Sequence, residues 1–202
     1  MLTKFSVKNF KNFKDEIVFD LSKPKEYQFN SKCIKDGSIN KVMIYGKNAS
    51  GKTNLILALF DIVSKLTDNS TIPVKFYKNL LALKDETVDF VYEFLLDGSK
   101  IEYKYSKVDN DTFTYEKLSI NGNTIVELDR ISNNDKINLD WDSLTKSGFD
   151  NKLKDTKFSV IKYIYKNSKI NDFTDATSKT FVKFINFIEN MLMFYSLRGN
   201  AF

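Results

Sequence analysis

Gly46-Lys47-Asn48-Ala49-Ser50-Gly51-Lys52-Thr53 matches the pattern G-x-x-x-x-G-K-[ST] at every fixed position. Gly46 is expected to let the chain turn sharply out of a strand, and Gly51 to let the backbone approach phosphate oxygens. Lys52 would supply a mobile cation to the β- and γ-phosphates, while the Thr53 hydroxyl would bind Mg²⁺. Residues 46–53, the phosphate loop, therefore predict a site for a nucleoside triphosphate, with Mg-ATP as the expected ligand.

The residues on both sides of the phosphate loop have the pattern that the motif requires. Lys41-Val42-Met43-Ile44-Tyr45 is a short apolar run ending at a glycine, which predicts a buried strand. After Lys52 the apolar residues recur at helical spacing and predict a helix ending between Lys65 and Asn69. Such a helix would direct the positive end of its dipole at the phosphates. A chance match in a surface turn is the alternative, and the agreement between motif and flanks disfavours it.

The rest of the chain predicts strands first and helices later. Alternating polar and apolar residues predict an antiparallel hairpin of strands at 4–8 and 16–21, followed by a loop over 22–40. After Pro73, turn signals separate the segments of a predicted antiparallel meander: Thr87 to Leu96, Lys100 to Val108, Thr112 to Ile120 and Thr124 to Leu128. Beyond Arg130 the chain turns polar and then helical. The best helix runs from about Thr174 to Tyr195, with an apolar face of Phe181, Phe184, Ile185, Ile188, Met191, Leu192 and Tyr195.

Composition excludes several classes of function. The chain has 202 residues, 42% apolar and 28% charged, as in a soluble globular protein with one large domain or two lobes. It has no histidine and one cysteine, Cys33, which excludes histidine-based catalysis, a multi-thiolate zinc site and an internal disulfide. No apolar run approaches the roughly 18 residues that span a bilayer, so we expect a cytoplasmic protein without a membrane partner. The net charge of +5 is dispersed and is weak evidence for nucleic acid.

Alternating aromatic residues in the predicted meander have two interpretations. On paper they resemble a platform on which nucleic-acid bases stack. Alternating aromatics in such strands usually form the core, and this interpretation is favoured. The residues are Phe90, Tyr92, Phe94, Tyr103, Tyr105, Phe113 and Tyr115.

The wording of the motifs resembles one group of ATPases. The phosphate loop with Asn54 after it resembles that of the RecF/SMC/ABC-type ATPases, which typically show G-x-N-G/A-S-G-K-S/T followed by Asn. The opening stretch Phe5-Ser6-Val7-Lys8-Asn9-Phe10-Lys11-Asn12-Phe13 is similar to the strand and N-F-x-x-F turn of the same group. The layout resembles most the bacterial AAA-type, ABC-like ATPases of phage defence and abortive infection, whose E-x-L segment is comparable to Glu116-Lys117-Leu118. The resemblance covers residues 1–130, and beyond them it is only a shared tendency to helices.

The resemblance implies a fold, an activity and a site. The fold would be an α/β P-loop NTPase: an ABC/RecF-like ATPase lobe with an antiparallel β-layer over residues 1–130, and a C-terminal helical lobe over residues 131–202. The activity would be ATP hydrolysis with Mg²⁺, Lys52 acting in catalysis and Thr53 on the metal. Lys11 would either approach the nucleotide or be an ordinary exposed lysine. The nucleotide-binding residues would be Gly46, Lys47, Asn48, Ala49, Ser50, Gly51, Lys52, Thr53 and Asn54.

The resemblance also implies partners: a head-to-tail homodimer around two ATP molecules, coupled to nucleic acid or to a nuclease or other effector. Other parts of the family's site are missing from the sequence, namely an apolar strand ending in two acids, a signature loop and a switch histidine. Val88 to Glu93 is interpreted as part of a hairpin, Leu118 to Gly122 as a hairpin turn, and Gln28 precedes the phosphate loop.

These absences lie in the second half of the expected domain, so we expect the N-terminal portion of a longer ATPase. A naturally short protein with a degenerate site is the alternative. A regulatory module that binds ATP without hydrolysing it is the second functional hypothesis. A GTPase is disfavoured because no segment resembles Asn-Lys-x-Asp.

Overall fold

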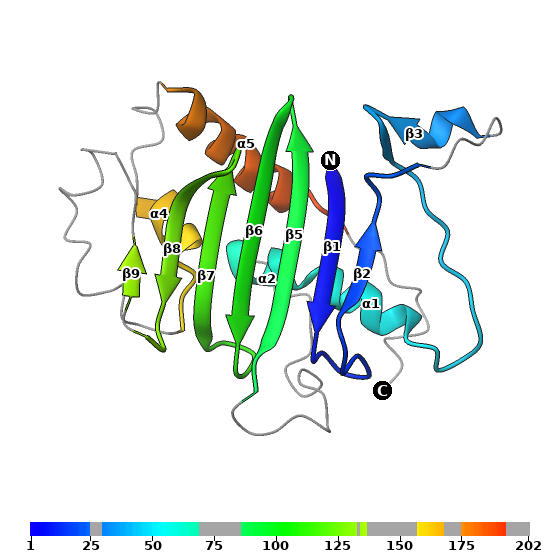
Figure 1. Cartoon of the computed structure of the whole chain (residues 1–202), viewed down its shortest axis with the longest axis horizontal. Coiled ribbons are helices and arrows are strands. Elements are labelled where there is room, and N and C mark those ends of the chain that lie inside the picture. The colour runs from blue at the N-terminus through cyan, green and yellow to red at the C-terminus, as the bar shows by residue number, and fades with distance from the viewer. Residues whose placement is uncertain (25–29, 69–85, 133, 137–156, 168–174, 193–202) are drawn as a thin grey trace.

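A seven-stranded antiparallel sheet forms the frame of the molecule (Figure 1). The computed structural model describes residues 1–24, 30–68, 86–132, 134–136, 157–167 and 175–192. The strands lie in the order β2-β1-β5-β6-β7-β8-β9, and each neighbouring pair is antiparallel. Their bounds are β1 Leu2–Lys8, β2 Ile17–Asp20, β5 Val88–Leu96, β6 Ser99–Lys107, β7 Phe113–Ile120, β8 Asn123–Asp129 and β9 Asn134–Lys136. The predicted first hairpin and the predicted meander are both confirmed.

The helices of the described residues cover one face of this sheet (Figure 1). They are α1 Lys52–Leu59, α2 Asp61–Leu66, α4 Val160–Asn167 and α5 Ala176–Glu189. The long helix α5 contacts β5, β7 and α2, so the C-terminal helices share one core with the sheet. The division into lobes at residues 130 and 131 stays a prediction. None of the described helices is long and apolar enough to cross a membrane.

Side chains alternate across the sheet, as strand geometry requires. In β5 the inward residues are Val88, Phe90, Tyr92 and Phe94, all at most 1% exposed. The rings of Phe90 and Tyr105 stack at 4.8 Å, and Phe94 meets Phe184 of α5 edge-on at 5.4 Å. Six of the seven aromatic residues singled out in the meander are buried in this way, which confirms the core interpretation; Tyr115 is half-buried and bonds Glu127 instead.

The apolar run before the phosphate loop departs from its prediction. Residues 41–45 form no strand, and Met43 and Tyr45 are 84% and 88% exposed. In Figure 1 this segment runs beyond the β2 edge of the sheet, after the small hairpin of β3 (Ile34–Lys35) and β4 (Ser38–Ile39). A strand buried on both faces needs neighbours on both sides, and the part of the chain that the structure describes supplies none.

Two helix predictions need smaller corrections. The helix that starts at Lys52 breaks at Phe60 (φ −89°, ψ 1°), so it is two short helices, α1 and α2. The C-terminal helix ends at Glu189, and Leu192, expected on its apolar face, is 72% exposed. Tyr195 lies outside the described residues. The expected face is otherwise confirmed, with Phe181, Phe184, Ile185 and Ile188 buried and Met191 packed against the core.

Candidate functional site

The phosphate loop is exposed and is closed by its own lysine. Residues 46–50 are all exposed, between the extended segment and α1. The Lys52 ammonium donates hydrogen bonds to the carbonyl oxygens of Gly46 (2.9 Å) and Lys47 (2.7 Å). A cation held only by neutral carbonyls is a strong donor for an incoming anion, because charge-assisted hydrogen bonds are stronger than neutral ones. Lys52 is therefore placed where it can exchange the loop carbonyls for phosphate oxygens.

The start of α1 suits an anion. Gly51 is the N-cap of α1 with φ +93°, and no side chain caps the first turn. No acidic residue lies in that turn, and the Thr53 side chain is exposed there. The first N–H groups of a helix have no intrahelical acceptor, and they carry the positive end of the dipole. The chain's own donors thus fit a triphosphate, and the Thr53 hydroxyl is the group that would hold Mg²⁺.

The N-terminal hairpin turn packs directly under the phosphate loop. A side-chain carbon built on Gly51 would lie 2.6 Å from Nδ2 of Asn12 and 3.0 Å from the Phe13 ring, and the φ of +93° strains any other residue, so glycine is strongly favoured at this position. Asn54 of α1 donates to Oδ1 of Asn12 at 2.6 Å. Lys11 is half-buried in this turn, and desolvation lowers the pKa of its ammonium. The turn thus lies against the loop, while the approach of Lys11 to a nucleotide stays a prediction.

Gly46 has a different role from the predicted one. It follows an extended segment and not a strand, and a side-chain carbon there would lie 3.1 Å from Oγ of Ser50. That contact is with a small side chain that can rotate. Gly46 is therefore less constrained than Gly51.

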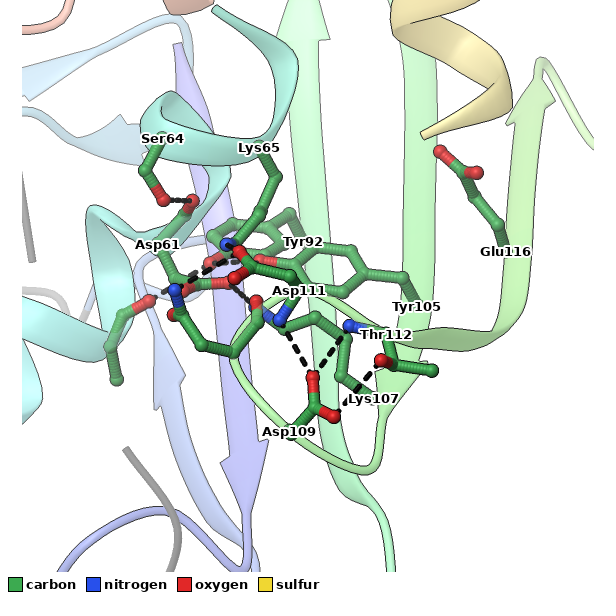
Figure 2. Close-up of polar contacts among 12 residues, drawn as sticks. Asp61, Ser64, Lys65, Tyr92, Tyr105, Lys107, Asp109, Asp111, Thr112 and Glu116 are labelled. Carbon is green, nitrogen blue, oxygen red and sulfur yellow. Dashed lines mark hydrogen bonds and ion pairs between the residues drawn. The ribbon is translucent and has the colours of Figure 1, made fainter. Parts of the chain in front are cut away.

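The other end of α1 is held by a buried polar network between α2 and the sheet (Figure 2). Oδ2 of Asp61, the first residue of α2, accepts from the Lys107 ammonium (2.7 Å) and from the Tyr105 hydroxyl (2.7 Å). The Tyr92 hydroxyl donates to the carbonyl of Ala58 in α1 (2.9 Å) and lies 3.3 Å from that of Tyr105. Asp61, Lys107, Tyr92 and Tyr105 are all fully buried.

Burial controls the protonation of this network. Desolvation lowers the pKa of Lys107 from its ordinary 10.5 to about 8, although Asp61 opposes the shift. Desolvation also raises the pKa of the Tyr92 hydroxyl well above its ordinary value, so Tyr92 remains a donor.

A pH dependence of stability follows from Lys107. Between pH values near 8 and 10.5 the unfolded chain binds more protons than the folded one, so the free energy of unfolding rises with pH. We expect a gain of about 1 kcal/mol between about pH 7.5 and about pH 9, below the range in which tyrosines titrate. Urea unfolding at the two pH values measures it. Lys107→Met should remove most of the gain. The remainder would come from the Met1 amino group, whose pKa is also lowered by burial, and an undiminished gain in the variant would contradict the assignment to Lys107.

A second buried acid fixes the C-terminal helices to the sheet. Glu116 of β7 accepts from the hydroxyls of Tyr103 (2.8 Å) and Ser159 (2.5 Å) and from the backbone N–H of Val160 (2.7 Å) at the start of α4. In Figure 2, Glu116 lies below α4, apart from the Asp61 network. The segment Glu116-Lys117-Leu118 therefore has a structural role here.

Neither the acids of β5 nor Asp61 of α2 is placed to complete a catalytic site at the loop. Asp89 and Glu93 of β5 alternate with the inward aromatics and so point to the sheet face opposite α1. Asp61 is closer along the chain, but its carboxylate is bound to Lys107 and Tyr105. The described residues contain no group of three or more acids, cysteines or histidines that could hold a metal ion.

The signal for Lys107 and Glu116 was present in the sequence. Lys107 continues the inward phase of Ile101, Tyr103 and Tyr105, and Glu116 shares its phase with Leu118. A charged residue in an inward position predicts a buried pair. The partners could not be predicted, because they come from distant elements.

Comparison with known families identifies one family. A family model described as "AAA domain, putative AbiEii toxin, Type IV TA system" matches residues 41–196. The matched range covers more than half of the chain and contains the whole phosphate loop. The chain belongs to this family.

This AAA domain is thus an AAA-type P-loop ATPase domain of the abortive-infection kind, as its motifs suggested. Its mixed α/β content and mostly antiparallel sheet agree with the predicted fold class. No curated protein matches the chain.

Proposed function

We propose that this AAA domain binds Mg-ATP in the phosphate loop and belongs to the RecF/SMC/ABC-like branch of ATPases. The observation that carries the proposal is the Lys52 ammonium, which rests on two carbonyls of an exposed loop at the uncapped start of α1. Lys52 would bind the β- and γ-phosphates and stabilise charge during transfer. Thr53 would hold the metal, and the backbone N–H groups of residues 46–51 would surround the phosphates. Bound Mg²⁺ supplies charge neutralisation between the phosphates.

Side chains at the edge of the loop would add specific contacts. Asn48 lies at its exposed tip and would orient a phosphate oxygen or a water molecule. Ala49 has φ +62°, a conformation that tightens the tip of the loop. Asn54 fixes the loop to the N-terminal turn through Asn12. Lys47 and Ser50 lie beside them and complete the binding set.

Hydrolysis would need groups beyond this set. The sequence shows no apolar strand ending in two acids and no signature loop, so these parts of the site would come from elsewhere. We propose a homodimer around two ATP molecules. Apolar side chains flank the loop on both sides, with Met43 and Tyr45 before it and Ile56 of α1 41% exposed after it. Exposed apolar patches of this kind are typical of interaction surfaces.

The dimer would control a nuclease or other effector, or act on nucleic acid, in phage defence inside the cell. A regulatory module that binds ATP without hydrolysing it is the alternative function. The observation that favours it is that the sequence has no apolar strand ending in two acids.

Lys52→Ala tests ATP binding directly. Because one charge-assisted contact to the phosphates is lost, we expect the affinity for Mg-ATP to fall about 100-fold or more. Titration calorimetry measures the affinity, and phosphate release measures turnover. Lys41→Ala, which removes an exposed lysine outside the loop, is the matched control and should bind as the wild type does. Binding without Lys52-dependent phosphate release would favour the regulatory module, and no binding by the wild type would reject both functions.

Met43→Lys combined with Tyr45→Lys tests the proposed dimer. Two charges placed on the apolar segment should weaken ATP-dependent association about 10-fold or more, since charged groups resist desolvation. Sedimentation with and without ATP measures the association. Ile131→Lys, at the opposite edge of the sheet and also exposed, is the control. Equal association of both variants would reject this surface.

A further inference from the structure

We propose that Asp61 and Lys107, acting through Tyr105 and Tyr92, are positioning residues that fix the far end of α1 and thereby set the affinity of the phosphate loop for nucleotide. The inference rests on the proposed nucleotide binding. It concerns a network that touches no nucleotide, at the end of α1 away from the loop.

Helix α1 is short. The helix has eight residues, Lys52–Leu59, and therefore only about two turns. Its first residue is the phosphate-binding lysine, and its penultimate residue, Ala58, accepts the hydrogen bond from Tyr92. Phe60 then breaks the helix, so α1 is not continued by α2 as one rigid rod. A displacement at Ala58 is consequently transmitted to Lys52 over a short, stiff element.

The Tyr92 hydroxyl is oriented by the neighbouring hydroxyl of Tyr105. Each tyrosine hydroxyl has one proton. Tyr105 donates its proton to the carboxylate of Asp61, which leaves the Tyr105 oxygen as an acceptor only. Tyr92 then donates either to the Ala58 carbonyl or toward Tyr105, 3.3 Å away. The state of Asp61 therefore decides how firmly the end of α1 is held.

Several groups surround Lys107, whose positive charge balances the negative charge of Asp61. Lys107 extends from β6 and faces groups from several elements. The charged and polar groups include Asp61 and Lys65 of α2, and Asp109, Asp111 and the carbonyl of Asn110 (3.5 Å) in the β6–β7 loop. The rings of Tyr105, Phe90 and Phe113 lie beside its ammonium, the last two at 5.3 and 5.8 Å. Lys65 pairs with Asp111 at 3.2 Å, where the network meets the surface. Asp61 is the one acid that bonds Lys107 directly among the described residues.

The loss of the Lys107 ammonium would rearrange the hydrogen bonds of Asp61. A buried ion that loses its partner rearranges its surroundings, because an unpaired charge is costly in the interior. Oδ1 of Asp61 has no hydrogen-bond partner in the described structure, so it provides no bond that could compensate for the loss of Lys107. Without Lys107 the carboxylate would draw the tyrosine hydroxyls to itself and release Ala58.

The experiment compares nucleotide affinity with folding. Mg-ATP affinity is measured by titration calorimetry, at a temperature where circular dichroism shows each variant fully folded. A purely structural residue would leave the affinity of the folded molecules unchanged under these conditions. We expect Tyr92→Phe, which removes only the hydroxyl that holds Ala58, to bind Mg-ATP about tenfold more weakly. Lys107→Met should weaken binding at least as much.

Two further variants sharpen the result. Asp61→Asn combined with Lys107→Met removes both charges and keeps an acceptor for Tyr105, so it should bind more tightly than Lys107→Met alone. Lys104→Met is the matched control, since Lys104 lies in the same strand on the opposite face and pairs with Glu102 there. Wild-type affinity in Tyr92→Phe and Lys107→Met, together with loss of binding in Lys52→Ala, would overturn the inference and leave the proposed function standing.

A nucleotide-free measurement separates the two proposals. Amide hydrogen exchange should show lower protection factors for α1 in Tyr92→Phe, with α5 unchanged as an internal reference. This result is expected even if the wild type does not bind ATP, in which case the proposed function fails alone. Unchanged protection of α1 would overturn the positioning role whatever the binding data show.

Discussion

Lys107→Met is expected to lower the free energy of unfolding by about 1–3 kcal/mol, because the buried carboxylate of Asp61 loses one of its two hydrogen-bond donors. Methionine approximates the shape of the lysine stem, so the loss would come from the missing hydrogen bond to Asp61 and not from a cavity. Lys107 and Asp61 are both fully buried, and the variant leaves the carboxylate of Asp61 with only the Tyr105 hydroxyl. Urea unfolding followed by circular dichroism measures the change.

The double variant Asp61→Asn with Lys107→Met gives the decisive control. A buried ion pair replaced as a pair is often neutral or even stabilising, because both desolvation penalties disappear together. The double variant should therefore recover most of the stability lost in the single one. Strictly additive losses in this cycle would mean that the two residues are not coupled. Lys104→Met, partly exposed in the same strand, should change stability by less than about 1 kcal/mol.

Glu116→Ala is expected to cost about 3 kcal/mol or more. The carboxylate accepts three hydrogen bonds, and their donors Tyr103, Ser159 and the N–H of Val160 would be left without it. Two of these donors lie at the start of α4, so the substitution also removes the cap of that helix. Thermal unfolding measures the loss, and amide exchange should show α4 released before the sheet.

Two variants separate the causes. Glu116→Gln keeps an oxygen for Val160 and should recover roughly half of the loss. Glu102→Ala removes an acid from the other face of β6, where it pairs only with Lys104 at the surface, and should be close to neutral. A loss in Glu102→Ala as large as that in Glu116→Ala would show that the sheet does not tolerate the loss of either acid.

The fold was predictable wherever the pattern is local. Turn residues such as Asn121 and Gly122, with φ of +52° and +82°, mark the β7–β8 hairpin in the sequence as clearly as in the structure. The alternation in β5 and β6 predicted the aromatic core for the same reason. The break at Phe60 was not predictable, because it accompanies the burial of Asp61, and the partner of Asp61, Lys107, lies far along the chain.

The candidate site was predictable only in part. The phosphate loop is a contiguous motif, so its residues could be named from the sequence alone. The prediction of a buried strand at residues 41–45 was wrong. It rested on the apolar character of the run, and the described residues provide no neighbouring strands that would bury it. The packing of Asn12 and Phe13 against Gly51 is a contact between separate segments, and local patterns carry no information about its geometry.

The position of β1 in the sheet has a consequence for the order of folding. Strands β5 to β8 are joined by short turns and can pair early. Strand β1 pairs with β5 through residues as far apart in the sequence as Lys8 and Asp89, so this pairing must close a long loop. Closing such a long loop costs conformational entropy before any contact rewards it. The phosphate loop lies within that segment, so its final shape should appear only after β1 docks. A kinetic probe placed at residue 48 should then report a slower phase than one placed in the meander.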